Sequence, residues 1–286
     1  MVRARIVVVS YNAAEFIGGA LESALAQTVP CEVVVVDNDS SDATAELVAA
    51  RYPAIRVIRS GANLGFGAAA NLGAFDGSPA YEYLALLNSD ARAQPSWIER
   101  TCAWMERAGV GIGSSVVSAG SGTFFAGGAW RPLLGAAIKR ARYTEEATDW
   151  VSGCAMIARR SAFERLGGFD DAYFLYFEDV DLSLRASATG VRLGVFGEAL
   201  VDHPQEGRSA DQLGSLLKRR IGLYSKGRCV RRFVPGYALP AALAFQCSVS
   251  PFANGASPRE YPSLVAAFLA GFRGSRSGSP SPRSTN

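Results

Sequence analysis

The sequence lacks the cysteine and histidine patterns of a zinc-binding or disulfide-bonded protein. It contains one histidine, His203, and five scattered cysteines that form no Cys-x-x-Cys pair. Neither a cysteine-based zinc site nor a disulfide framework is therefore supported. We expect reduced thiols, as in a cytosolic protein.

Long apolar runs are also missing. The run Ile6–Val9 near the N-terminus is too short for the apolar region of a signal peptide. No stretch approaches the ~20 apolar residues that span a bilayer, and residues 237–245 and 264–272 come closest. We therefore expect a cytoplasmic protein that does not cross the membrane but can lie peripherally on the inner face of the cell membrane.

Acidic residues are absent from one long segment. No Asp or Glu lies between Gln212 and Arg259, where seven cations crowd together: Lys218, Arg219, Arg220, Lys226, Arg228, Arg231 and Arg232. The net charge of +3 is too small to predict nucleic acid binding. The asymmetry instead predicts a catalytic body with a basic appendage that faces an anionic membrane surface. Apolar residues recur at helical spacing here (Leu213, Leu216, Leu217, Ile221 and Tyr224), which fits an interfacial helix or one packed on the catalytic domain.

The composition is that of a globular protein, with 49% hydrophobic and 19% charged residues among 286. We predict a catalytic domain over residues 1–210 and a basic, apolar helical appendage over 211–272. Residues 273–286, rich in Gly, Ser, Pro and Arg, are predicted to be a disordered tail.

Alternating strand and helix patterns predict an α/β fold with a doubly wound mixed sheet. Apolar β-branched runs at 6–9 and 32–36 are typical of strands buried on both faces. Further strands are predicted at 55–59, 83–87, 151–159, 192–196 and 199–201, and helices at 14–27 and 43–51. Residues 118–149 lose this periodicity and are interpreted as a flexible loop or flap over the site.

Polar clusters follow three of the predicted strands: Ser10-Tyr11-Asn12, Asp37-Asn38-Asp39 and Asn88-Ser89-Asp90. Any one cluster fits a turn. Together they predict a ligand site, because ligands bind beyond the carboxyl ends of strands in such sheets. A carboxylate at Asp90 can hold a divalent cation that bridges a diphosphate, although a cap or turn residue is the alternative.

Two further segments carry candidate chemistry. Gly65-x-Gly67-x-x-Ala70 matches a dinucleotide fingerprint, but the preceding strand ends too early, near Arg59; a glycine-rich turn that brings backbone close to a ligand is the alternative. Glu178 and Asp179 follow an aromatic run and open a predicted helix. Aromatic surroundings raise a carboxyl pKa and a helix N-terminus lowers it, so a general base is one reading and ordinary first-turn acids the other. His203, just after a strand, is structural or binds metal or phosphate.

Six motifs together resemble the inverting glycosyltransferases of family 2, which have the GT-A fold, and most closely the rhamnosyltransferase-type branch. They span residues 6 to about 210 and are Val7–Asn12, Val35–Thr44, Asn63–Gly67, Leu87–Ala91, Gly167–Asp170 and Glu178–Leu182.

The resemblance implies a role for each candidate residue. Nucleotide-sugar binding would fall to Ser10, Tyr11, Asn12, Asp37, Asn38, Asn63, Gly65, Phe66, Asn71 and Ser89. Asp179 matches the catalytic base, with Glu178 beside it. Asp90 matches the metal-binding aspartate of the DxD motif, whose first position is Asn88 here, and His203 matches a histidine that completes the metal site, which would hold Mn²⁺ or Mg²⁺.

The function implied is inverting sugar transfer from a nucleotide-diphosphate donor to a saccharide or lipid-linked saccharide in envelope polysaccharide synthesis. We consider dTDP-L-rhamnose first as donor, with a UDP-hexose or UDP-galactofuranose as the alternative. A nicotinamide-dependent oxidoreductase and a sugar-nucleotide-binding protein without turnover are alternatives from other classes. No nucleic acid partner is expected.

Overall fold

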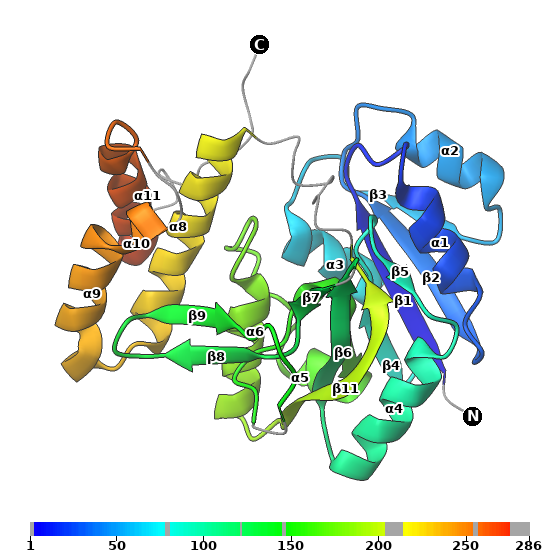
Figure 1. The fold of residues 1–286 in the computed structure, drawn as a ribbon. Helices are drawn as coiled ribbons and strands as arrows, with labels where there is room; N and C mark the ends of the chain where they lie inside the picture. Colours follow the sequence, from blue (N-terminus) through cyan, green and yellow to red (C-terminus); the bar gives the residue numbers. More distant parts are fainter. Residues whose placement is uncertain are drawn as a thin grey trace.

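The computed structural model describes residues 3–77, 81–120, 122–144, 147–203, 214–253 and 257–274. The main sheet consists of β1 (Ala4–Ser10), β2 (Cys31–Asp37), β3 (Arg56–Arg59), β4 (Tyr83–Leu86), β5 (Arg92–Ala93), β6 (Ile112–Ala119), β7 (Gly122–Phe125), β10 (Met156–Arg159) and β11 (Leu193–Asp202). Its order is β3-β2-β1-β4-β10-β6-β11-β5, and β7 pairs with β6 (Figure 1). The predicted α/β class with a mixed sheet is confirmed.

The first half of the sheet is parallel. β1 pairs with β2 and with β4, so that Ser10 lies opposite Asp37 and Val7 lies opposite Leu86. Nearly all of β1 is buried, as expected for an apolar run in the middle of a sheet. The ends of β1, β2 and β4 therefore meet at one edge.

In the second half of the sheet, one antiparallel strand, β10, lies between β4 and β6. β10 runs antiparallel to both β4 and β6, and β11 runs parallel to β6. β6 and β11 consequently point the same way as β4. The carboxyl end of β11 and the residues just before β10 thus lie at the edge where β4 ends.

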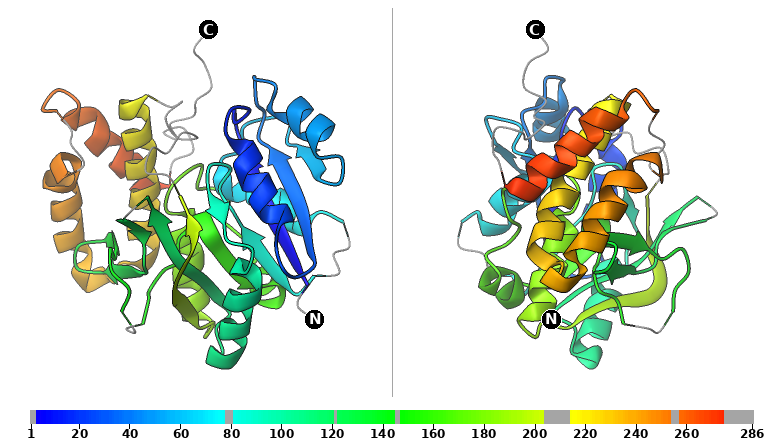
Figure 2. Two further views of the ribbon diagram at one scale, coloured as in Figure 1. Left: turned by 45° about the vertical axis from the view of Figure 1, so that its right-hand side comes forward. Right: turned by 90° about the vertical axis from the view of Figure 1, so that its left-hand side faces the viewer.

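Helices surround the sheet and supply the rest of the site (Figures 1 and 2). They are α1 (Ile17–Leu25), α2 (Thr44–Arg51), α3 (Phe66–Phe75), α4 (Trp97–Ala108), α5 (Arg160–Arg165), α6 (Glu178–Ala188) and the single turn η1 (Gly153–Ala155). Both α1 and α3 pack on β1 and β2, whereas α4 packs on β6 and β11.

Three predictions for the second half of the sheet need correction. Residues 118–149 contain β7 and a separate hairpin, β8 (Gly128–Arg131) with β9 (Ala136–Lys139), rather than only a flexible loop. The predicted strand 151–159 is η1 followed by the shorter β10, and the two strands at 192–196 and 199–201 form one irregular strand, β11. Short, glycine- and alanine-rich strands give little periodic signal, which explains the first error.

The C-terminal region is helical, as predicted. It contains α8 (Ser215–Phe233), η2 (Gly236–Ala238), α9 (Leu239–Ser248), α10 (Ser250–Ala253) and α11 (Tyr261–Arg273). α8 and α11 cross in direct backbone contact (Figure 2). A Cβ on Gly227 would lie 2.1 Å from the Phe268 carbonyl oxygen, and one on Gly271 would lie 1.9 Å from that of Tyr224, so both positions require glycine.

Helix α8 is anchored to the catalytic body through a buried carboxylate. Asp181 accepts hydrogen bonds from Arg185 Nε at 2.6 Å and from an Arg232 guanidinium nitrogen at 3.0 Å. Ser225 donates to the Leu175 carbonyl oxygen at 2.9 Å. Packing of α8 is therefore observed. The predicted boundary at 210, the side chain of Leu213 and all but the first two residues of the predicted tail lie outside the described residues.

Candidate functional site

The ends of β1 and β2 form the first part of the site. Ser10 and Asp37 are buried there in register. Asp37 accepts from the backbone N–H of Ser40 with one oxygen, at 3.3 Å, while its buried Oδ1 has no hydrogen-bond partner among the described residues. An unsatisfied buried carboxylate oxygen calls for an explanation, and a bound ligand with hydroxyl or N–H donors supplies one.

Asn38 connects this edge to the glycine-rich segment before α3. Its amide donates to Asn63 Oδ1 at 3.0 Å and to the Gly65 carbonyl oxygen at 3.2 Å, and its Oδ1 accepts from Leu64 N at 2.9 Å. Asn38 therefore fixes the shape of the 63–65 loop.

Gly65 allows the aromatic segment before α6 to approach α3. Its φ is +84°, and a Cβ there would lie 1.9 Å from the Phe174 carbonyl oxygen. Phe66 N donates to that same oxygen at 3.0 Å. The glycine pattern thus serves close packing around the site rather than a strand-to-helix dinucleotide turn, because α3 does not follow β3 directly.

The N-terminus of α6 presents the two adjacent carboxylates. Asp179 Oδ2 accepts from Gly153 N at 3.0 Å, and its Oδ1 accepts from Val180 N at 2.8 Å. Burial raises the pKa of Asp179, and these backbone hydrogen bonds lower it in part. The result is an oriented carboxylate with an elevated pKa, as a general base requires.

Glu178 is more deeply buried than its neighbour. Burial, and then the charge of Asp179, raise its pKa to about 8. Its Oε2 has no hydrogen-bond partner among the residues that the structure describes. The raised pKa favours the protonated form of Glu178, in which the carboxyl group can donate a hydrogen bond.

Asp90 and His203 converge as predicted, although 113 positions separate them in the chain. His203 Nε2 lies 3.3 Å from Asp90 Oδ1 and 3.1 Å from Asn88 Nδ2. The side chains of His203 and Asp90 are buried. His203 follows β11, and its backbone N–H donates to the Ser118 carbonyl oxygen at 2.8 Å. The Phe124 ring stacks on the imidazole at 4.7 Å.

This pair fits a divalent cation in its donor chemistry. A carboxylate and an imidazole are suitable ligands, and ions such as Mg²⁺ take few protein ligands when substrate phosphates supply others. Among the described residues no group of three or more His, Cys, Asp or Glu side chains forms a complete protein cage. A metal here would depend on the substrate for its remaining ligands.

The remaining predicted residues line or shape the site. Ser89 is buried and Tyr11 is half-buried. Asn12 Oδ1 accepts from Ser41 N at 2.7 Å. The Asn71 amide donates to the Phe169 carbonyl oxygen and accepts from the Phe169 N–H. Both side chains therefore fix neighbouring loops. Nucleotide-sugar binding by individual residues stays a prediction.

Two residues at the site were missed by sequence reasoning. Gly153 supplies a hydrogen bond to Asp179, and Phe124 covers His203. Gly153 interrupts the apolar run of the predicted strand 151–159. This interruption is the one feature of the sequence that indicates a turn before β10. Phe124 lay in the segment interpreted as a loop and carried no signal of its own.

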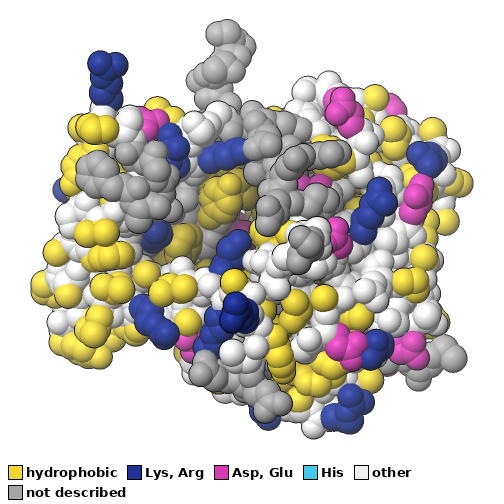
Figure 3. Space-filling model, in the orientation of Figure 1, with side chains coloured by type: hydrophobic (Ala, Val, Ile, Leu, Met, Phe, Trp, Pro, Cys, Tyr) yellow, Lys and Arg dark blue, Asp and Glu magenta, His cyan; other side chains and the backbone are white. Residues whose placement is uncertain are grey.

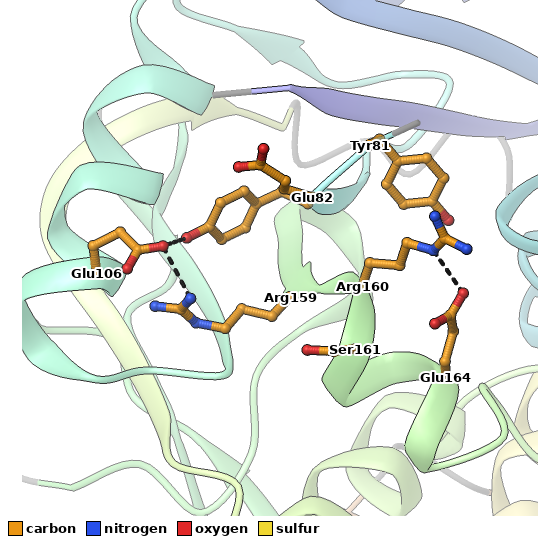
Figure 4. Close-up of a pocket in the computed structure, with 8 residues that line it drawn as sticks. Tyr81, Glu82, Glu106, Arg159, Arg160, Ser161 and Glu164 are labelled. Atoms are coloured by element: carbon orange, nitrogen blue, oxygen red, sulfur yellow. Dashed lines mark hydrogen bonds and ion pairs between the residues drawn. The ribbon is translucent and has the colours of Figure 1, made fainter. Parts of the chain in front are cut away.

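A cavity of about 410 Å³ lies away from these residues. It is lined by Tyr81, Glu82, Tyr83, Glu106, Arg159, Arg160, Ser161 and Glu164 (Figure 4). Its walls come from the beginning of β4, the end of β10, α4 and α5, at the edge of the sheet opposite to the one where Asn88 lies. Its cations are paired, Arg159 with Glu106 at 2.9 Å and Arg160 with Glu164 at 2.6 Å, as in a structural ion-pair network.

Comparisons with known proteins give a consistent result. The family model described as glycosyl transferase family 2 matches residues 5–167. N-acetylglucosaminyl-diphospho-decaprenol L-rhamnosyltransferase of Mycobacterium tuberculosis is 31% identical over 216 residues, which cover 65% of this chain and 70% of that protein. Rhamnosyltransferase WbbL of Escherichia coli K12 is 49% identical over 55 residues, 19% of this chain and 21% of its own length.

Two solved structures show the same fold. S. aureus TarS 1-349 in complex with UDP-GlcNAc has a TM-score of 0.64 at 17% identity and covers 95% of this chain and 82% of its own. Mannosyltransferase PcManGT from Pyrobaculum calidifontis, in complex with GDP-Man and Mn²⁺, has a TM-score of 0.56 at 20% identity, with 97% and 83% covered. The fold is the GT-A fold.

Proposed function

Because the chain belongs to glycosyl transferase family 2, we propose that it transfers a sugar, with inversion, from a nucleotide-diphosphate donor to a saccharide of an envelope polysaccharide. The observation that carries this proposal is the meeting of three polar groups at one edge of the sheet. These are Asp37, the Asp90–His203 pair and Asp179.

The nucleotide is proposed to bind at the ends of β1 and β2. Ribose hydroxyls or a base N–H would satisfy the free Oδ1 of Asp37. Asn38 would keep the 63–65 loop in place around the sugar nucleotide.

Asp179 is proposed as the general base. The acceptor hydroxyl gives its proton to the carboxylate, its oxygen bonds to the anomeric carbon, and the bond from that carbon to the diphosphate oxygen breaks. Attack opposite the leaving group inverts the centre without a covalent enzyme intermediate. A fixed negative charge near the anomeric carbon also stabilises an oxocarbenium-like transition state, as in glycoside hydrolysis.

Asp90 and His203 would hold a divalent cation, Mn²⁺ or Mg²⁺. Bound there, the cation would neutralise charge on the departing diphosphate. The His203 side chain is held in place by Asn88 and by the stacked Phe124 ring, and it lies 3.3 Å from Asp90.

The donor is proposed to be dTDP-L-rhamnose, because two relatives are named as rhamnosyltransferases. A UDP-hexose or UDP-galactofuranose is the second candidate, since TarS binds UDP-GlcNAc on the same fold. The acceptor is proposed to be a lipid-linked saccharide, after the diphospho-decaprenol in the name of the first relative. The oxidoreductase alternative is set aside, because the enzyme is a glycosyltransferase.

The test is a calorimetric screen of dTDP, UDP and GDP followed by transfer assays with the matching sugar nucleotides. We expect one nucleoside diphosphate to bind more tightly than the others, and its sugar to appear in the product with inverted anomeric configuration by NMR. Retention of configuration, or no binding of any nucleoside diphosphate, would contradict the proposal.

We further propose that the enzyme docks on an anionic membrane at the inner face of the cell. No helix among the described residues is long and apolar enough to span a bilayer. An exposed apolar surface, however, covers α9 and the tip of the β8–β9 hairpin (Figure 3). It includes Leu133, Leu134, Tyr237 and Val249, of which Tyr237 is 84% exposed.

This apolar surface replaces α8 as the proposed membrane contact. Several α8 cations already have partners within the protein: Arg219 pairs with Glu260 at 2.6 Å, Arg231 donates to the carbonyl oxygen of Phe272, and Arg232 bridges Asp170 and Asp181. Gln246 of α9 donates to the carbonyl oxygens of Leu134 and Gly135, which makes the helix and hairpin tip one continuous surface. Large exposed apolar patches with cations nearby are typical of interaction sites.

A further inference from the structure

Lys139, the last residue of β9, brings a cation to the side of the candidate site. Its ammonium group lies 3.9 Å from the centroid of the Phe124 ring. The His203 imidazole also stacks on the Phe124 ring, with the ring centroids 4.7 Å apart and the ring planes inclined by 17°. The hairpin thus ends beside the Asp90–His203 pair, and its inner end lies next to β7 (Figure 1).

Among the residues that the structure describes, the Lys139 ammonium group makes no hydrogen bond or ion pair, and it lies over the Phe124 ring. The Asp179 carboxylate acts on it only through its charge. The arginines of α8 differ, because Arg219 and Arg232 are paired with carboxylates. An unpaired cation at the edge of a binding site is positioned to meet an anionic ligand.

The charges of Lys139, Asp90 and Asp179 all act on the buried Cys154 thiol. Burial raises the pKa of the Cys154 thiol, the charges of Asp90 and Asp179 raise it further, and the charge of Lys139 lowers it. Partial burial likewise lowers the pKa of Lys139, and the Asp179 carboxylate partly offsets this effect. Lys139 therefore shares one electrostatic environment with the proposed base and the proposed metal ligand.

We propose that Lys139 binds the diphosphate group of a substrate in the active site. A lysine ammonium is a compact point charge of the kind that binds phosphate oxygens. This inference rests on the proposed function. The diphosphate belongs either to the nucleotide donor, where it becomes the leaving group, or to a lipid-linked acceptor.

The course of the hairpin is compatible with the acceptor as the source. Its tip, at Leu133 and Leu134, belongs to the exposed apolar surface, whereas Lys139 lies at the opposite end of β9. Strand β9 covers four residues, or roughly 13 Å at the usual rise per residue. The β8–β9 hairpin thus carries apolar residues that can contact lipid at its tip and the Lys139 cation, which can bind a diphosphate, at its other end.

The test compares Lys139→Met, which removes the charge and keeps an apolar stem, with Lys139→Arg, which restores the charge. Arg131→Met is the matched control, because it removes an exposed cation from the neighbouring strand β8, opposite Ala136. Calorimetry measures the Kd of dTDP and UDP. Steady-state kinetics measure the KM of a diphosphate-linked acceptor and of the same saccharide without the diphosphate.

A donor contact predicts that Lys139→Met weakens binding of the preferred nucleoside diphosphate about tenfold or more, with nucleoside binding unchanged. An acceptor contact predicts a similar rise in KM only for the diphosphate-linked acceptor. Lys139→Arg retains binding in both cases. If every value for Lys139→Met stays within about twofold of the Arg131→Met control, Lys139 binds no diphosphate and the proposal is wrong. Failure of the wild-type enzyme itself to bind dTDP or UDP would instead contradict the proposed function.

Discussion

The protonation of Glu178 gives a quantitative prediction for protein stability. The residue is only 6% exposed, and the pKa of its carboxyl group rises from 4.5 to about 8 in the folded state. The folded protein therefore binds a proton more tightly than the unfolded chain, so stability is lost as pH rises from the unfolded pKa to the folded one. At pH 7 the unfolded group is ionised and the folded group is neutral, which costs about 3 kcal/mol.

The Glu178→Gln substitution removes this cost, because glutamine does not ionise. Its unfolding free energy relative to wild type is expected to increase by about 2–3 kcal/mol between pH 5 and pH 7. Urea unfolding at pH 5, 6, 7 and 8, followed by tryptophan fluorescence, measures the difference. The comparison between pH values cancels any constant packing effect of the amide.

A difference between Glu178→Gln and wild type that is independent of pH would refute this reasoning. It would mean that Glu178 is ionised in the folded protein and that its unpartnered Oε2 is solvated or ligated. Activity offers a second measure. Since glutamine resembles the protonated acid, kcat at pH 7 is expected to fall far less than in a variant lacking the base.

Two further predictions concern the metal and the membrane. Chelator is expected to reduce activity and Mn²⁺ or Mg²⁺ to restore it, and Asp90→Ala or His203→Ala should weaken nucleoside-diphosphate binding about tenfold; full activity in chelator with both variants unimpaired would indicate a metal-free mechanism. Tyr237→Glu combined with Val249→Glu is expected to abolish cosedimentation with anionic vesicles at low salt, while Leu25→Glu on α1 retains it. Wild-type protein that does not sediment with such vesicles would exclude the membrane contact.

The first half of the fold was predictable because its strands carry a strong local signal. The valine-rich runs of β1 and β2 end in polar residues, and the parallel pairing brings Ser10 and Asp37 together. The hairpin was not predictable in the same way. Its strands, Gly-Ala-Trp-Arg and Ala-Ala-Ile-Lys, have little β-branched character and only four residues each.

Partners distant in sequence were the other limit. Arg232 was assigned to a membrane-facing cluster by its neighbours, yet it pairs with Asp181, a residue of the helix that carries the proposed base. Lys139 is likewise 15 positions from Phe124 in the sequence, yet its ammonium group lies over the Phe124 ring, which stacks on His203. The sequence shows that the C-terminal segment is rich in lysine and arginine. Which of these cations form ion pairs with carboxylates depends on the fold.

Asp179→Asn tests the central claim most directly. The measurement pairs kcat for sugar transfer with the calorimetric Kd of the preferred nucleoside diphosphate, which also verifies that the variant is folded. A kcat lower by about 10²–10⁴-fold with a Kd within about twofold of wild type is the predicted result, because the substitution removes proton transfer and leaves the nucleotide site intact. Near-normal kcat at unchanged Kd would contradict the assignment of Asp179 as the base.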